Sequence, residues 1–209
     1  MVNRKTLIVG ATFVLGMVAV LGLYFPGIRP EPLGTRTVTG TVDIGGPFTL
    51  VDQRGQEVTE ASLKGRYALV FFGFTNCPDI CPLTLQIITQ ALEIAGPLGE
   101  DVVPVFITVD PERDTPDVME QYVANFHPRF RALTGTAAAA RQAADGYRVF
   151  FRKAVASAAA SGDPSSYMME HSGFVYFMGR DGAYITHFGA QTTAEAMAAR
   201  IRQETSPSK

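Results

Sequence analysis

Two short stretches that are almost entirely apolar constrain the fold of this chain more than any other feature. Residues 67–72 read YALVFF and residues 102–109 read VVPVFITV, without the regular polar alternation of a half-exposed strand. Runs of this length and composition predict strands that are buried on both faces of a sheet. Between them, apolar residues recur at helical spacing over residues 83–94 and stop at a Gly-Pro pair. A strand, a helix and a second buried strand in this order predict an α/β fold.

The rest of the sequence completes a mixed sheet that is flanked by helices. Further predicted strands and hairpins cover residues 48–59, 130–133, 147–155 and 174–188. Further predicted helices cover residues 115–126, 136–144 and 193–202. Residues 156–166 are small and polar, and predict a mobile loop. We therefore expect one α/β domain with a mixed sheet.

Composition and charge exclude several classes of protein. The chain has 209 residues, which is enough for one domain with a substantial core and an additional anchoring segment. Its 18 basic and 20 acidic residues give a formal net charge of -2, so no basic excess is available to neutralise a nucleic-acid backbone. Two cysteines are too few for a disulfide-stapled scaffold. We expect no nucleic-acid partner.

An uncharged apolar stretch near the amino terminus predicts a membrane anchor. Residues 7–25 follow Arg4 and Lys5, and as a helix they would reach roughly 28 Å, which matches the hydrocarbon core of a bilayer. The positive charges predict a cytoplasmic amino terminus and an exported remainder, in the periplasm if the membrane is a bacterial inner membrane. A cleaved signal peptide is the alternative, but its apolar region would be shorter and would end at small residues. Here the run ends in Leu-Tyr-Phe-Pro.

This interpretation divides the chain into five parts. The linker after the anchor is assigned from its Gly, Pro and Thr content. The parts are a cytoplasmic tail at residues 1–6, a single transmembrane helix at 7–25, a linker at 26–46, a globular domain at 47–204 and a tail at 205–209.

Cys77 and Cys81 lie between the first buried strand and the helix that follows it. A disulfide between them would close too small a loop to stabilise the fold much. If the segment is helical, the spacing of four places both sulfurs on one face, and the helix amino terminus lowers the thiol pKa. Such a pair forms a disulfide, reduces another disulfide or binds a soft metal ion. Two Cys and three His cannot build a closed Cys-rich zinc site, whereas Cu(I) accepts two thiolates and one imidazole.

Three histidines are candidates for the imidazole ligand. His127 lies at the end of a predicted helix and suits a surface or capping role. His187 lies within the last predicted strand, and His171 directly precedes an apolar strand. The residues alone do not choose between His171 and His187.

Four further residues lie near the candidate site in the sequence. Asp110 follows the second buried strand, where ligands gather in α/β sheets, and either orients a metal ligand or is an ordinary turn residue. Met168 and Met169 precede His171 and are soft donors, but methionine is more often a packing residue, so we leave them out of the site. Asp79 either tunes the thiols or caps the helix.

Three segments resemble motifs of the SCO/SenC family. Residues 72–82 read FGFTNCPDICP and resemble the cysteine signature of that family. Residues 109–115 (VDPERDT) and 170–172 (EHS) resemble its second and third motifs, in the same order, and the amino-terminal anchor is also typical. The resemblance covers about residues 48–202 and implies a thioredoxin-like fold.

The resemblance also implies a function. It implies a copper chaperone for the assembly of cytochrome c oxidase, which holds Cu(I) or Cu(II) with Cys77, Cys81 and His171. The implied partners are a copper donor protein and the oxidase subunit that carries the dinuclear copper centre. Delivery of copper requires no catalytic turnover, so enzymatic activity is not part of this expectation.

Two alternatives remain at this point. A thiol-disulfide oxidoreductase would use Cys77 and Cys81 to keep the copper-binding cysteines of the oxidase reduced, and a redox sensor would use the same pair. Thioredoxins, however, have two residues between their cysteines and a cis-proline that faces them. This chain has three residues between its cysteines and carries Glu170 and His171 where the proline would stand. Both differences favour a metal site.

Overall fold

The computed structural model describes residues 43–154 and 167–206 of the chain. These residues belong to the second of two compact units, Val42–Lys209. The predicted anchor at residues 7–25, the tail before it and the predicted loop at residues 156–166 lie outside the described residues. None of the helices that are described is both long enough and apolar enough to cross a membrane.

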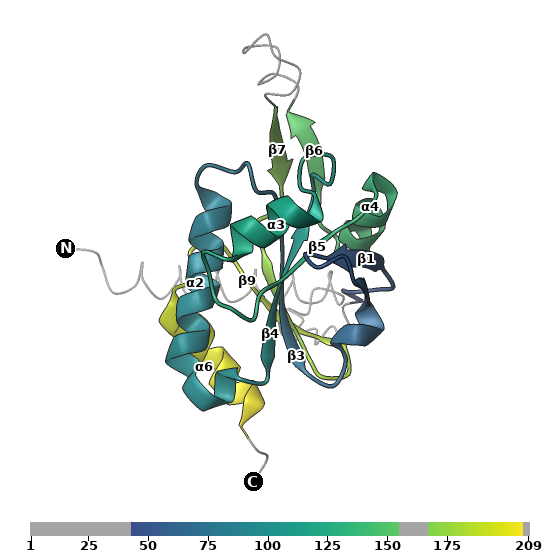
Figure 1. Cartoon of the computed structure of the whole chain (residues 1–209). Helices are drawn as coiled ribbons and strands as arrows, with labels where there is room; N and C mark the ends of the chain where they lie inside the picture. Colours follow the sequence, from purple (N-terminus) through teal and green to yellow (C-terminus); the bar gives the residue numbers. More distant parts are fainter. Residues whose placement is uncertain (1–42, 155–166, 207–209) are drawn as a thin grey trace, which may run out of the picture. The chain divides into compact units, whose positions relative to one another are not determined.

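A seven-stranded mixed sheet forms the centre of the domain (Figure 1). Its strand order is β2-β1-β5-β4-β3-β8-β9. The neighbours β5, β4 and β3 are parallel, and all other pairs in the sheet are antiparallel. The strands are β1 (Thr49–Asp52), β2 (Glu57–Thr59), β3 (Tyr67–Gly73), β4 (Val102–Thr108), β5 (Arg131–Thr134), β8 (Val175–Met178) and β9 (Tyr184–Phe188). The two apolar runs are the buried strands β3 and β4, and the predicted α/β class with a mixed sheet is confirmed.

Helices cover both faces of this sheet (Figure 1). On one face, α2 (Ile80–Ala95) and α6 (Ala194–Thr205) pack against each other, and α3 (Pro116–Val123) lies on the same side. On the other face lies α4 (Ala137–Gly146). Successive residues of β3 alternate between the faces, because side chains along a strand point to opposite sides. Phe71 therefore packs on the α2 side, whereas Phe72 meets the ring of Tyr147 just after α4. Two short 3-10 helices, Glu60–Leu63 and Gly96–Gly99, complete the fold.

Threonine side chains begin three of the helices. Thr115, Thr136 and Thr193 precede α3, α4 and α6, and each accepts a hydrogen bond from the backbone N–H three residues further on. This bond satisfies one of the free N–H groups at the helix start. Pro116 occupies the first position of α3, where its missing N–H costs nothing. The predicted starts of these helices are confirmed.

A separate two-stranded ribbon stands at the upper end of the domain in Figure 1. It consists of β6 (Phe151–Ala154) and β7 (Met168–His171), which pair antiparallel. The strand predicted at residues 147–155 is too long, because α4 continues to Gly146 and Arg148 has a positive φ of 55° that an extended strand excludes. The sequence pattern does not predict β7, whose four residues carry no clear alternation.

Candidate metal centre

The two cysteines lie in the turn that joins β3 to α2. The helix begins at Ile80, so Cys81 is in its first turn while Cys77 lies in the loop before it. The prediction that both cysteines share one helix face is therefore wrong. The Cys77 sulfur instead accepts a hydrogen bond from the backbone N–H of Cys81, with 3.5 Å between Sγ and N. Both cysteines are free thiols, Cys81 fully buried and Cys77 partly exposed.

A glycine at the end of β3 makes room for the buried thiol. A Cβ atom on Gly73 would lie 2.8 Å from the Sγ of Cys81 and 2.9 Å from the ring of Phe106. Both separations are far below van der Waals contact, so any larger residue would displace the thiol or the ring. The glycine in the FGF sequence is thus explained by the close approach of α2 to the strand.

His171, the last residue of β7, brings its imidazole to the same place. Its Nε2 lies 3.6 Å from the Sγ of Cys81, and its Nδ1 lies 3.0 Å from the carbonyl oxygen of Ser172. A carbonyl oxygen only accepts, so Nδ1 donates to Ser172 and the neutral ring presents a lone pair at Nε2 toward Cys81. Edge-to-face contacts with Phe71 and Phe74 hold the ring in this orientation.

Burial controls the protonation of both groups. It raises the pKa of the Cys81 thiol, so the prediction of a lowered thiol pKa is wrong for this cysteine. The helix amino terminus does not overcome the loss of solvent around a fully buried sulfur. Burial also lowers the pKa of His171, against a smaller opposing effect of the bond to Ser172. At neutral pH the pair is therefore a thiol beside a neutral imidazole.

The donor chemistry of the three side chains fits a soft metal ion. Two sulfurs and one imidazole nitrogen are the donors that Cu(I) prefers. Over residues 43–154 and 167–206, no three His, Cys, Asp or Glu side chains already form a closed metal-ligating group. The arrangement is thus a fixed Cys81–His171 pair with the Cys77 sulfur beside it at the helix start. A metal cation would displace the proton of the Cys81 thiol, because metal ligation stabilises the thiolate.

The other two histidines lie away from the cysteines. His187 pairs with Tyr176 across β8 and β9, and Tyr176 pairs with Val70 of β3. Val70 points to the face opposite to that of Phe71 and the cysteine loop, so His187 lies on the wrong face of the sheet. Its Nδ1 contacts the hydroxyl of Tyr184 at 2.5 Å.

His127 follows α3, and its backbone N–H donates to Thr89 in the second half of α2. Its Nδ1 accepts a hydrogen bond from the backbone N–H of Arg129. His127 thus binds a backbone N–H in the turn after α3 and caps no helix there, and its contact with α2 at Thr89 is remote from Cys81.

Asp110 belongs to a buried cluster beside the ribbon. Its carboxylate forms an ion pair with Arg113, at 2.5 Å between Oδ2 and Nε, and accepts a hydrogen bond from the hydroxyl of Tyr167 at 2.7 Å. Arg113 also stacks on the ring of Tyr167 and donates to its backbone carbonyl. Tyr167 directly precedes β7, so this cluster fixes the start of the strand that carries His171. Asp110 is thus more than an ordinary turn residue, because its carboxylate connects Arg113 with the residue that precedes β7.

Asp114 is a buried carboxyl that the sequence interpretation missed. It accepts hydrogen bonds from the backbone N–H and the hydroxyl of Thr75, in the cysteine loop, and from the hydroxyl of Thr108 at the end of β4. Burial raises its pKa, against the effect of these bonds. Asp114 therefore ties the cysteine loop to the central sheet. Its place in the VDPERDT segment could have indicated it, because the loop after a buried strand lies at the sheet edge where sites form.

The remaining candidates line a groove between the cysteine loop and β7. Met168, Met169 and Asp79 all border this groove together with Cys77 and His171. Met169 is buried and counts among the core residues, as its assignment to packing predicts. Asp79 occupies the position before α2, but its side chain makes no capping hydrogen bond.

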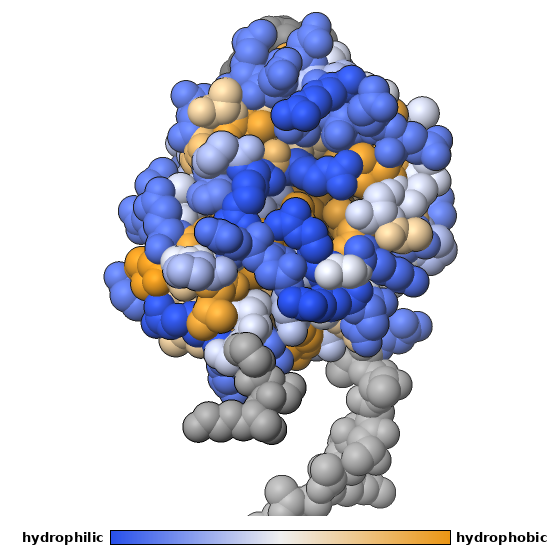
Figure 2. Space-filling model, turned by 60° about the horizontal axis from the view of Figure 1, so that its bottom comes forward, coloured by the Kyte–Doolittle hydropathy of each residue, from blue (hydrophilic) through white to orange (hydrophobic). Residues whose placement is uncertain are grey.

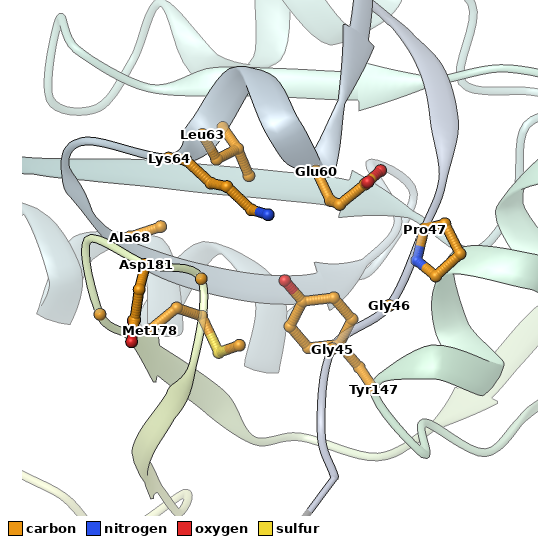
Figure 3. Close-up of a pocket in the computed structure, with 12 residues that line it drawn as sticks. Gly45, Gly46, Pro47, Glu60, Leu63, Lys64, Ala68, Tyr147, Met178 and Asp181 are labelled. Atoms are coloured by element: carbon orange, nitrogen blue, oxygen red, sulfur yellow. The ribbon is translucent and has the colours of Figure 1, made fainter.

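A second pocket lies on the opposite face of the sheet (Figure 3). Ala68 and Met178, which pair across β3 and β8, form part of its wall. The amine of Lys64 and the hydroxyl of Tyr147 point toward its interior, whereas the carboxylate of Glu60 accepts a hydrogen bond from the backbone N–H of Phe48. Its lining contains neither a thiol nor an imidazole, so it does not compete with the cysteine loop as a metal site.

The fold and the site together define the class of this protein. It is a thioredoxin-like α/β domain that presents two cysteines at the carboxyl end of a central strand and a histidine from an added ribbon. The chain belongs to the SCO1/SenC family, whose model matches residues 36–206. The resemblance drawn from the three sequence motifs is thereby confirmed.

Individual relatives support the same assignment. A SCO2-like protein of Rickettsia prowazekii is 41% identical over 163 residues, which are 78% of this chain and 78% of that protein. The structure of Bradyrhizobium japonicum ScoI with copper bound is 41% identical, with a TM-score of 0.69, and the match covers 77% of this chain and 99% of that one. BsSco, a member of the Sco family of cytochrome c oxidase assembly proteins with a disulfide switch, is 25% identical with a TM-score of 0.63 over 79% of this chain and 96% of that one.

Proposed function

We propose that this protein is a copper metallochaperone that binds Cu(I) or Cu(II) through Cys77, Cys81 and His171. The observation that carries the proposal is the Nε2 lone pair of His171, which faces the Sγ of Cys81 at 3.6 Å. Membership of the SCO1/SenC family and the copper bound to the Bradyrhizobium japonicum relative support it. Copper is the cargo of this protein, and its delivery breaks no covalent bond in the chain.

The proposed recipient is the oxidase subunit that carries the dinuclear copper centre, and the proposed source is a copper donor protein. BsSco is a member of a family of cytochrome c oxidase assembly proteins, which supports this choice. Of the three ligands, the Cys77 sulfur is the more accessible thiol and lies in a loop rather than in a helix. We infer that ligand exchange with donor and recipient begins at Cys77, while Cys81 and His171 keep the ion bound on the buried side of the site.

The apolar run at residues 7–25 anchors the protein in this proposal. A single span with positive charges on its amino-terminal side would place the copper-binding domain in the exported compartment.

The imidazole beside Cys81 favours copper binding over disulfide reduction as the main role. A reductase would use the accessible Cys77 as its nucleophile and has no need of the Nε2 lone pair that faces Cys81. Burial raises the pKa of Cys81 and keeps this thiol protonated at neutral pH. A copper ion provides the positive charge that removes this proton, so a raised pKa does not prevent metal binding.

A complementation experiment separates the two roles. The full chain, with His171→Ala, would be expressed in a host whose own family member is deleted, and oxidase activity would be measured against wild type and the control His187→Ala. The chaperone proposal expects His171→Ala to lose oxidase assembly and His187→Ala to retain it. Full assembly with His171→Ala would contradict the proposal and would indicate a reductase that needs only the cysteines.

A further inference from the structure

Four arginines surround a groove at the end of the domain that is remote from the cysteines. Arg54 lies in the β1–β2 turn, Arg66 directly precedes β3, and Arg129 and Arg131 lie where the chain enters β5. We call this the arginine groove. The cysteine loop follows the last residue of β3 whereas Arg66 precedes the first, so the whole length of the strand separates the two sites. Figure 2 looks onto the lower end of the domain in Figure 1, and strongly hydrophilic side chains cover much of its middle.

The walls of the groove are fixed by hydrogen bonds. Gln53 donates from its side chain to the carbonyl of Phe130 and accepts from the backbone N–H of Ala132, which ties the β1–β2 turn to the start of β5. Arg129 donates through Nη1 to the backbone carbonyls of Gly99, Glu100 and Val102. The pocket between these walls has a volume of about 410 Å³, which is within the usual range for small-ligand sites.

The positive charges of the groove are only partly compensated. Arg131 lies 3.6 Å from Asp52, a long ion pair, and Arg66 is bonded to the neutral carbonyl of Glu100. In the described part of the chain, the guanidinium of Arg54 makes no hydrogen bond or ion pair. Burial and the neighbouring charge of Arg66 lower the pKa of Arg129, as expected where cations are crowded together.

Asp52 is already occupied as an acceptor. Its Oδ1 receives the backbone N–H groups of Arg54 and Gln56. Four arginines therefore line one cavity whose lining contains a single carboxylate, in a protein whose net charge is -2. Guanidinium forks match the oxygen geometry of phosphate and bind it in a bidentate manner.

We propose that the arginine groove binds a phosphate-bearing anion, which is either a lipid headgroup or a free phosphate compound. The site is independent of the copper ligands, since it lies at the other end of the central strands. Two exposed arginines outside the groove, Arg152 and Arg180, are each paired with a carboxylate and provide a matched control.

The test uses the full chain in nanodiscs of neutral phosphatidylcholine. In one arm, inorganic pyrophosphate is titrated and its dissociation constant is measured by calorimetry. In the other arm, phosphatidylglycerol replaces part of the lipid and the rise in the melting temperature of the domain is measured. The variants are Arg54→Gln/Arg66→Gln and the control Arg152→Gln/Arg180→Gln, which lose the same charge. A response to pyrophosphate alone indicates a free phosphate compound, and a response to phosphatidylglycerol alone indicates a headgroup.

The proposal expects the groove variant to respond to the effective probe roughly tenfold or more weakly than wild type, since each arginine supplies charge-assisted hydrogen bonds. The response of the control variant should stay within about twofold of wild type, because this variant retains all four arginines of the groove. Copper loading of the groove variant should match that of wild type, because the groove is remote from the copper ligands. If wild type responds to neither probe, or if the control loses as much as the groove variant, the proposal is wrong. Should the double variant fold poorly, Arg54→Gln alone serves, because that guanidinium holds no structural bond within the described residues.

Discussion

The imidazole of His171 and the thiol of Cys81 lie 3.6 Å apart between Nε2 and Sγ, although 90 residues separate them in the chain. The β3–α2 turn places the sulfur, the β6–β7 ribbon places the ring, and the carbonyl of Ser172 selects the nitrogen that faces the sulfur. Two of the three proposed copper donors are therefore positioned before any metal arrives. Preorganisation of this kind reduces the ordering cost of binding.

The two cysteines should differ in reactivity. We expect iodoacetamide to modify Cys77 well before Cys81 in the folded chain, because Cys81 is fully buried and burial raises its pKa. Mass spectrometry of the peptide that contains both residues, at successive times, measures the order. The Cys77→Ser variant is the control, in which Cys81 should remain slow. Modification of both cysteines at equal rates would contradict the burial of Cys81.

Gly73→Ala should displace the Cys81 thiol from its position beside His171. The added Cβ would lie 2.8 Å from the Sγ of Cys81, so the thiol must shift away from His171. We expect a loss of about 1–3 kcal/mol in the free energy of unfolding from overpacking, together with weaker copper binding. Urea unfolding and competition with a Cu(I) chelator measure the two effects. Gly189→Ala is a matched control, since its Cβ would meet nothing closer than 4.0 Å. Equal copper affinity in both variants would show that Cys81 tolerates the shift.

Tyr167→Phe should make the start of β7 less rigidly held. The substitution removes the hydrogen bond to Asp110 and leaves a buried carboxylate with one partner fewer. We expect a loss of roughly 1–3 kcal/mol in the free energy of unfolding. Copper affinity should fall several-fold as His171 becomes less well held. Urea unfolding and chelator competition give both values, and Tyr184→Phe, which removes a hydroxyl on the opposite face, is the control. If the two variants behaved alike in copper binding, Asp110 would not act through the ribbon.

The stability of the domain should carry a pH signature of Asp114. Burial raises the pKa of this carboxyl above its unfolded value, which is about 3.9. A group shifted in this direction stabilises the fold fully below its unfolded pKa, and that contribution is lost as the pH rises through the folded pKa. Relative to wild type, Asp114→Asn should thus gain stability as the pH is raised from about 4. Urea unfolding across this pH series measures the difference, and a difference that is constant with pH would contradict the raised pKa.

The sequence predicts the central strands well because their signal is local. The apolar runs that became β3 and β4 need no knowledge of their neighbours, and the same holds for the helix starts at Thr115 and Thr193. The start of α2 is harder to predict. Ile80 and Cys81 already belong to that helix, which places Cys77 outside it and changes how the two sulfurs meet.

The parts of the site that depend on contacts distant in the sequence could not be predicted from the residues alone. The strand β7 exists through its pairing with β6, and the choice between His171 and His187 depends on which face of the sheet each occupies. The resemblance to the SCO/SenC family selected His171, and the face of the sheet gives the physical reason. Asp114 was missed because its hydrogen bonds reach Thr75, 39 residues away.

The copper content and optical spectrum of the full chain, for wild type and His171→Ala, test the central claim most directly. We expect wild type to bind about one copper per chain and, as Cu(II), to show a thiolate-to-copper charge-transfer band. His171→Ala should bind copper more than about tenfold more weakly with a changed band, while His187→Ala should match wild type. Unchanged copper affinity and an unchanged spectrum in His171→Ala would show that the imidazole facing Cys81 is not a copper ligand.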